Sequence, residues 1–292
     1  MATIPNQSHS SDMQVFIDQL GGHGKLLRSN DGSVLIKPSI GFEKAFYEQS
    51  ILQPDFAAWL PKYYGSLQLH QAQDENPTLA VAICLENITH NFSKPCVLDL
   101  KLGTRLYLDT ESDAKKQKMI RKAEISTSKN LGIRLVAFRV YKEATDAYIL
   151  YDREYGYTLT DDTVLTGFKN YFDADIPPHL HQLIIKRFLK NLTDFANVLE
   201  KTELRMYSAS LLFVYEGSRE ALEKALAREE DELKKSGDDD ADEDASSCKP
   251  TDMRMIDFAH SYFAKGIGKD EGCLLGVMNT IKYLTMLLDD EK

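Results

Sequence analysis

The sequence predicts an α+β fold with two unequal lobes, and three observations support this prediction. The chain has 292 residues, of which 43% are hydrophobic and 27% are charged, an ordinary composition for a globular protein. That length allows one large domain or two lobes with a ligand cleft between them. Short apolar runs typical of strands dominate the first half, whereas helical periodicity dominates the second. Such segregation is typical of the α+β class.

The first half is expected to be rich in strands. Residues 1–14 are polar and are predicted to be disordered. The Asn30-Asp31-Gly32 turn is a hairpin signal before the first strand, and Pro54 is expected to stop the helix that follows. The elements expected here are strands over Ser33–Lys37, Leu79–Leu85 and Val97–Leu100, and helices over Lys44–Leu52 and about Asp113–Ile125.

The second half is expected to combine a strand hairpin with long helices. His179–Thr202 carries an apolar stripe at helical spacing, which predicts an amphipathic helix. The other elements expected here are strands over Ile133–Tyr141, Ala147–Tyr151, Ser210–Tyr215 and Arg254–Phe258, and a helix over Leu274–Leu288.

Acidic residues concentrate between positions 217 and 250. This segment holds twelve Asp or Glu and six Lys or Arg, a local charge of −6 out of −10 for the chain. Arg219–Lys235 is rich in Ala, Glu and Lys and could be helical, whereas Ser236–Ser247 is expected to be a solvated, flexible run. We interpret 217–250 as an acidic, flexible insert between two strands.

The composition excludes several classes of protein. A net charge of −10 argues against a general nucleic-acid binder. No apolar run approaches the roughly 18 residues of a membrane helix, and the N-terminus lacks a secretory core, so we expect no membrane association. Four widely spaced cysteines form neither a zinc motif nor a disulfide framework, which fits a reducing compartment such as cytosol or nucleus.

Two charged residues occur on one predicted strand. Alternation places Asp99 and Lys101 on the same face, with Leu98 and Leu100 opposite. A buried strand rarely carries two charges on one face unless they are paired or line a cleft. A structural ion pair is one interpretation. We prefer a polar cleft wall, because a second carboxylate also occurs within an apolar strand sequence.

That second carboxylate is Asp257, which lies in the apolar run 255–259 and is followed by His260. A lone aspartate at the end of a buried strand suits a Mg²⁺ ligand, because Mg²⁺ sites often combine one or two carboxylates with substrate phosphates. The alternative for Asp257 is that it caps the next helix. The alternative for His260 is a structural role.

Basic residues occur in two informative places. Lys37 ends an apolar strand; it either reaches water or is fixed by the sheet to neutralise ATP phosphates, as in kinases. On the helix after Asp113, Lys115, Lys118 and Lys122 share a face, and Arg121 neighbours Lys118. Such a run is usually a solvated face. Above a cleft it would suit a small, densely phosphorylated substrate.

These motifs, in this order, resemble the inositol polyphosphate kinase family. The family signature Pro-x-x-x-Asp-x-Lys-x-Gly is met by Pro95–Gly103, and its Ser-Ser-Leu-Leu and Ile-Asp-Phe motifs correspond to Ser208–Leu212 and Ile256–Phe258. The likeness runs from about Gly21 to Leu288 and omits the acidic insert. Two positions depart from the pattern: Ala209 replaces the first serine, and Asn87 stands where relatives often carry aspartate.

The resemblance implies a protein-kinase-like fold, with an ATP cleft between a small sheet-rich lobe over about 15–86 and a larger lobe over about 87–292. Mg²⁺ and ATP are the implied cofactors. The residues implied to bind ATP are Lys37, Glu86, Ile88, Asp99 and Asp257, with Asp257 on the metal. The implied catalytic residues are Asp99, Lys101 and Asp257. The residues expected at the inositol phosphate are Lys101, Lys115, Lys118, Arg121, Lys122, Arg139 and His260.

Several activities remain open within this resemblance. The compact length and the Asp-rich insert look like fungal multikinases acting on InsP3 and InsP4, whereas Ile120–Arg134 also resembles the InsP6 kinases; the InsP3 3-kinases are a third possibility. We rank multikinase first. A hypothesis of another class is a scaffold for transcription factors, with the acidic insert as the contact. We expect a monomer in the nucleus and cytoplasm.

Overall fold

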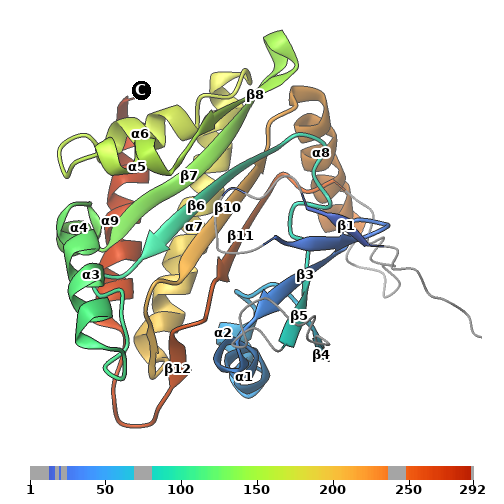
Figure 1. Ribbon diagram of the computed structural model, residues 1–292. Helices are drawn as coiled ribbons and strands as arrows, with labels where there is room; N and C mark the ends of the chain where they lie inside the picture. The colour runs from blue at the N-terminus through green and yellow to red at the C-terminus, as the bar shows by residue number, and fades with distance from the viewer. Residues whose placement is uncertain (1–12, 17–19, 21–24, 69–80, 236–247, 291–292) are drawn as a thin grey trace, which may run out of the picture.

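The computed structural model describes residues 13–16, 20, 25–68, 81–235 and 248–290 (Figure 1). Its helices and strands form two layered parts, each built on a five-stranded antiparallel sheet. The two parts are unequal lobes, and each contains strands as well as helices. This confirms the predicted α+β fold with two unequal lobes.

The smaller lobe is built on the N-terminal sheet, with strand order β1-β2-β3-β5-β4. Its helices are α1 and α2, and Pro54 begins α2 in addition to following the end of α1. Proline suits this position because the first turn of a helix needs no N–H from it. The bounds are β1 Met13–Val15, β2 Leu27–Ser29, β3 Val34–Ser39, α1 Gly41–Ser50, α2 Pro54–Ala57, β4 Tyr63–Gln68 and β5 Val81–Glu86.

The larger lobe is built on the sheet β11-β10-β6-β7-β8, in which all neighbours are antiparallel. A two-stranded sheet pairs β9 with β12. The bounds are β6 Pro95–Leu102, β7 Ile133–Lys142, β8 Ala147–Tyr151, β9 Leu204–Met206, β10 Ser210–Glu216, β11 Thr251–Ile256 and β12 Ser261–Phe263.

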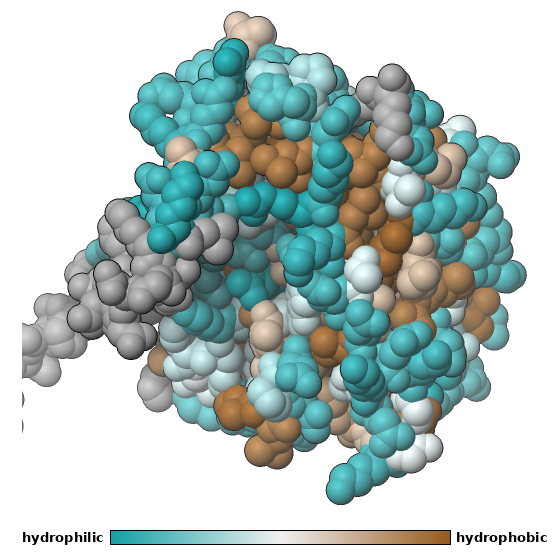
Figure 2. All heavy atoms as spheres, turned by 180° about the vertical axis from the view of Figure 1, so that it is seen from behind, coloured by the Kyte–Doolittle hydropathy of each residue, from teal (hydrophilic) through white to brown (hydrophobic). Residues whose placement is uncertain are grey.

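Helices cover one face of this larger sheet, with α7 and α9 behind the strands in Figure 1. The view from behind shows apolar patches between polar side chains (Figure 2), and Leu275 and Met278 of α9 are among the exposed apolar residues. None of the helices in the described part of the chain is long and apolar enough to span a membrane. The bounds are α3 Asp113–Glu124, α4 Ser128–Leu131, η1 Glu143–Thr145, α5 Arg153–Thr158, α6 Val164–Tyr171, α7 Pro178–Lys201, α8 Arg219–Lys235 and α9 Glu271–Asp290.

Strand β6 separates the core from the opposite face of the sheet. Leu98, Leu100 and Leu102 are buried in the main hydrophobic core, whereas Asp99 and Lys101 point to the other side. This is the alternation that the sequence predicts. Gly103 follows the strand with φ +96°, a backbone conformation that side chains with a Cβ rarely adopt, and its N–H donates to the Gly132 carbonyl.

The first part of the acidic segment is helical, as the sequence of Arg219–Lys235 allowed, and so it does not belong to a flexible insert. Residues 219–235 form α8, in which Leu222 and Ala225 are fully or almost fully buried, and Arg187 of α7 pairs with Glu229. An apolar stripe on an otherwise charged sequence is enough to dock a helix. Ser236–Ser247 lies outside the described residues, so its predicted flexibility stays a prediction.

Candidate active site

A cavity of about 510 Å³ lies between the two lobes. Its walls come from β3, α1 and β5 of the smaller lobe and from β6, β10, α3 and α5 of the larger one. Of the predicted site residues, those that line it are Lys37, Glu86, Ile88, Asp99, Lys101, Lys115, Lys122, Asp257 and His260. Residues separated by more than 200 positions are therefore brought to one place.

One half of the cavity is apolar. Leu35 and Leu85 line it from the smaller lobe, and Ile88, Val97 and Leu212 line it from the larger lobe. Glu86 and Ile88 lie where the chain passes from β5 to the larger lobe. An apolar slot of this kind can hold a flat heteroaromatic ring.

Asn87 fixes the shape of this connection. Its Nδ2 donates to the Gly32 carbonyl at 2.7 Å, and its Oδ1 accepts from the N–H and hydroxyl of Thr89 at 3.2 and 2.8 Å. An aspartate could accept both bonds from Thr89 but could not donate to Gly32. The asparagine that departs from the family pattern therefore has a structural role. It ties the turn before β3 to the segment that connects β5 to the larger lobe.

Lys37 is held between two carboxylates. Its Nζ lies 2.7 Å from Glu43 Oε1 and 2.6 Å from Asp257 Oδ1. Burial lowers the pKa of Lys37, but Asp257 and Glu43 outweigh that effect and leave the pKa raised. The ammonium is therefore charged at neutral pH and fixed in the cavity, which suits the neutralisation of phosphate.

Glu43 is a site residue that the sequence analysis missed. It is 2% exposed and also accepts from the Ser39 hydroxyl at 2.5 Å and the Phe258 N–H at 3.1 Å. Protein kinases use a similar lysine–glutamate pair between a strand and the next helix. An acid six residues after Lys37 was the available signal, but the predicted helix began one residue too late to include it.

Asp257 lies directly after β11 rather than inside the strand that the sequence predicts. Its φ of +68° is a left-handed conformation, which is uncommon and strained for a residue other than glycine. The turn directs its side chain, which is 35% exposed, into the cavity. Strain of this kind persists where the surrounding structure holds a functional group in place.

The carboxylates fit a hard divalent cation. Asp257 faces the cavity, and Oδ1 of Asp99 is buried there with no hydrogen-bond partner among the described residues. Carboxylate oxygens with nucleotide phosphates are the usual ligands of Mg²⁺. Asp257 and, next to it, Asp99 are therefore the residues here that could hold one.

Asp99 and Lys101 lie on the floor of the cavity. Burial raises the pKa of Asp99, and Asp257 adds to this, while Lys101 opposes it. Burial likewise lowers the pKa of Lys101, while Asp99 and Asp257 oppose that shift. Lys101 Nζ donates to the Ser208 carbonyl at 2.6 Å. Asp99 and Lys101, both in the described part of the chain, influence each other electrostatically but form no direct ion pair, and both line the cavity, which favours the cleft wall over the structural ion pair.

The second departure from the family pattern, Ala209, is fully buried, and its carbonyl accepts from the Leu102 N–H at 2.9 Å. The hydroxyl beside the site belongs to Ser210, which lies 3.4 Å from Lys101 Nζ and lowers the pKa of Asp99 by a hydrogen bond. Ser208 has φ +62°, so its carbonyl turns toward Lys101. A side-chain hydroxyl at position 209 is not needed for these contacts.

Helix α3 faces the other half of the cavity, but with a narrower stripe than predicted. Lys115, Met119 and Lys122, at i, i+4 and i+7, line the cavity. Lys118 and Arg121 are exposed and are not among the lining residues. Because each residue advances the helix by about 100°, the stripe that lines the cavity runs through Met119 and leaves Lys118 beside it.

His260 lies at the same end. Its Nδ1 is 3.7 Å from Glu111 Oε1, and the same oxygen pairs with Lys115 at 2.6 Å. Burial lowers the pKa of His260, with Glu111 opposing, so the imidazole is uncharged at neutral pH. His260 is therefore suited to hydrogen bonding more than to charge pairing.

Arg139 is not one of the described residues that line the cavity, although it was predicted to contact the substrate. It is 8% exposed on β7, and its guanidinium lies 4.8 Å from the centroid of the Tyr148 ring. Its cross-strand neighbour Val97 lies at the apolar end, so this arginine is too far along the strand to join the cationic half.

Arg134, Arg153 and Tyr157, which were not predicted from the sequence, also line the cavity. The Arg134 guanidinium lies 4.6 Å from the centroid of the Tyr157 ring. They come from β7 and α5, which carry no motif. The available signal was Arg134 as a charge within an apolar strand sequence.

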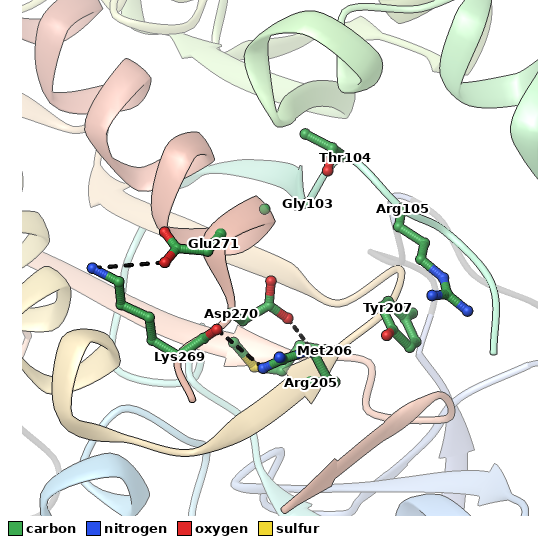
Figure 3. Close-up of a pocket in the computed structure, with 10 residues that line it drawn as sticks. Gly103, Thr104, Arg105, Arg205, Met206, Tyr207, Lys269, Asp270 and Glu271 are labelled. Atoms are coloured by element: carbon green, nitrogen blue, oxygen red, sulfur yellow. Dashed lines mark hydrogen bonds and ion pairs between the residues drawn. The ribbon is translucent and has the colours of Figure 1, made fainter. Parts of the chain in front are cut away.

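A second cavity of about 240 Å³ lies where β9 meets the start of α9 (Figure 3). Its polar groups bind one another: Asp270 accepts from the Met206 N–H at 2.8 Å, and Arg205 donates to the carbonyls of Ile267, Gly268 and Lys269. These contacts fasten α9 to β9, so we assign this cavity a structural role.

Comparison with known proteins identifies the family of this chain. The model of the inositol polyphosphate kinase family matches residues 82–285. The inositol polyphosphate multikinase of Saccharomyces cerevisiae is 32% identical over 91% of this chain and 96% of its own length. Human inositol hexakisphosphate kinase 1 is also 32% identical, over 76% of this chain and 56% of that protein.

A solved structure shows the same fold. The crystal structure of an inositol phosphate multikinase from S. cerevisiae, in complex with ADP and Mn²⁺, has a TM-score of 0.70 and 31% identity. The match covers 88% of this chain and all of that one. Together with the family match, this similarity shows that the chain belongs to the inositol polyphosphate kinase family.

Proposed function

We propose that this protein transfers the γ-phosphoryl group of ATP to hydroxyl groups of inositol polyphosphates, converting InsP3 to InsP4 and InsP4 to InsP5. One observation carries the proposal. A single cavity joins an apolar slot to a cationic half, with Asp99 and Lys101 between them. A nucleotide fits the first half and a small polyanion the second.

The nucleotide end uses Lys37 and Asp257. Lys37, held by Glu43, neutralises phosphate oxygens, and Asp257 orients the divalent cation. Asp257, with Asp99 next to it, would hold Mg²⁺ there, and the ion would supply positive charge that offsets the negative charge developing during transfer. The similar multikinase structure contains ADP and Mn²⁺, which supports the use of a divalent cation with the nucleotide.

The transfer occurs at the floor of the cavity. The inositol hydroxyl oxygen bonds to the γ-phosphorus and its proton is released to water, the bond from that phosphorus to the β–γ bridging oxygen breaks, and ADP leaves with the electron pair. Lys101 stabilises the γ-phosphoryl oxygens as the charge redistributes. The unpaired Oδ1 of Asp99 accepts a hydroxyl hydrogen, either from the ribose or from the reacting group.

InsP6 phosphorylation is the second candidate. The similarity to human inositol hexakisphosphate kinase 1, at 32% identity, supports it, although the chain covers only 56% of that protein. The yeast multikinase matches over 96% of its length, which favours the multikinase activity. The scaffold role and the location in nucleus and cytoplasm stay predictions from the sequence.

Incubation of the purified protein with ATP, Mg²⁺ and each of InsP3, InsP4, InsP5 and InsP6 tests the proposal. Product analysis should show InsP4 and InsP5 formed from InsP3, and ATP consumption that depends on the inositol phosphate. Turnover of InsP6 alone would assign the second candidate. Absence of turnover with all four would overturn the kinase proposal.

A further inference from the structure

Arg134 is a buried, charged residue of the cavity that has no role in the proposed phosphoryl transfer. The residue is 6% exposed, lines the cavity, and buries its Nη1 without a hydrogen-bond partner among the residues described. The guanidinium contacts the Tyr157 ring, which offers no acceptor oxygen in that direction. A buried guanidinium is normally paired or hydrogen-bonded, because leaving a polar group unsatisfied is costly.

The neighbours of Arg134 increase this cost. In the antiparallel pairing of β6 with β7, Arg134 lies directly opposite Lys101, and like charges directly opposite destabilise a sheet. Arg153 and Lys122 face the same space from α5 and α3. The nearby carboxylate, Asp99, interacts electrostatically with both Lys101 and Arg134, so it compensates these two cations only in part. Cations therefore converge from four elements onto a space with little negative charge.

The order of strands places this cluster away from the nucleotide. Crossing the sheet, Ile256 of β11 pairs with Ser210, Ser210 with Lys101, and Lys101 with Arg134. Asp257, which directly follows Ile256, and Arg134 are thus separated by about three strand spacings, roughly 14 Å, with Lys101 between them. A phosphate at Arg134 would therefore lie on the acceptor side of Lys101.

We propose that Arg134, with Arg153 and Lys122, forms a phosphate subsite that binds one phosphate group of the acceptor inositol polyphosphate. This inference rests on the proposed function and extends it from the predicted basic helix to β7 and α5. A phosphate dianion supplies acceptor oxygens for the unpaired Nη1 and compensates the clustered cations. The buried charge is then tolerated because a substrate phosphate supplies the missing hydrogen-bond acceptor.

The test compares Arg134→Met with Arg134→Lys and with a matched control, Arg139→Met. Methionine keeps the apolar length of the side chain and removes the charge. For Arg134→Met we expect the KM for InsP3 to rise about ten- to hundredfold, as for loss of a charge-assisted hydrogen bond, with the KM for ATP within about twofold. The KM of Arg134→Lys for InsP3 should lie between those of the wild type and Arg134→Met. Arg139 is a buried arginine of the same strand outside the cavity, so its variant should keep the KM for InsP3.

A thermal-shift measurement separates this role from a structural one. Without ligand, Arg134→Met should melt at the wild-type temperature or above it, because a buried unpaired charge is gone. Addition of InsP3 should then stabilise the wild type and stabilise this variant much less. A variant that melts lower and yet keeps the wild-type response and KM for InsP3 would overturn the subsite.

The two proposals fail in different ways. If the wild type is stabilised by InsP3 but phosphorylates no inositol phosphate, the kinase proposal fails and the subsite is still measured by binding. If the wild type turns over InsP3 and Arg134→Met does so with an unchanged KM, only the subsite fails. Should Arg134→Met not fold, the exposed Arg153→Met provides the same comparison, and we expect a several-fold rise in the KM for InsP3.

Discussion

Asp257 connects backbone strain with function at the scale of a single residue. The left-handed turn after β11 aims its carboxylate at the cavity, 2.6 Å from Lys37. We predict that Asp257→Asn lowers turnover by at least about a hundredfold, because the cation that offsets phosphate charge loses its anchor. Lys37 keeps its bond to Glu43, so the fold should be retained. Near-normal turnover of the folded variant at saturating ATP, InsP3 and Mg²⁺ would contradict this role.

Lys101 should act mainly on the transition state. It lies between the nucleotide end and the acceptor end, and its charge counts most as the γ-phosphoryl group moves. We predict that Lys101→Ala lowers kcat by about a hundredfold or more and changes the KM for ATP much less. Steady-state kinetics with varied ATP tests this. A normal kcat with a raised KM for ATP would indicate ground-state binding instead.

Single residues were predictable from the sequence where a charge interrupts an apolar pattern. Asp99, Lys101 and Asp257 stand out in this way, and the structure brings them to one cavity. Glu43 was missed because the predicted helix began one residue after it, and because its contact with the Phe258 N–H joins residues more than 200 positions apart, on which periodicity carries no information. Arg134 interrupts β7 in the same manner as Lys101 interrupts β6, but no second charge accompanies it at i+2.

At the scale of the elements, the bounds of α3 were predictable but its orientation was not. Ser112 caps the helix, and its hydroxyl accepts from the Lys115 N–H at 3.4 Å, a local interaction that the sequence encodes. The face turned to the cavity depends on α4, which packs against both α3 and β7. Several basic residues around the helix left more than one face available.

The basic helix therefore allows a matched comparison. Lys122→Ala and Lys115→Ala should each raise the KM for InsP3, by about tenfold or more, because both line the cavity. Lys118→Ala, on the same helix and exposed, should change that KM by less than about twofold. The KM for ATP should stay constant in all three. An equal rise in the KM for InsP3 in all three variants would contradict this. It would show that the total positive charge of the helix matters, and not which residues line the cavity.

At the scale of the whole molecule, the two lobes followed from the pattern of strands and helices, but the strand order did not. Alternation predicts which face of β6 is buried, whereas the position of β6 between β10 and β7 depends on pairings across more than 100 residues. That order decides the chemistry, since it sets Lys101 between Asp257 and Arg134.

The acidic segment should divide into a structural part and a part that catalysis does not need. Helix α8 buries Leu222 completely and pairs with α7 through Glu229, whereas Ser236–Ser247 has a composition that cannot form a core. We predict that replacing 236–247 by a short Gly-Ser linker leaves kcat and the melting temperature close to wild type. Replacing 219–247 should lower the melting temperature by several degrees, because burial of a leucine alone contributes about 1.5–3 kcal/mol. InsP3 turnover and thermal melts of both variants test this, and loss of turnover in the first variant with its fold intact would assign the segment a catalytic role.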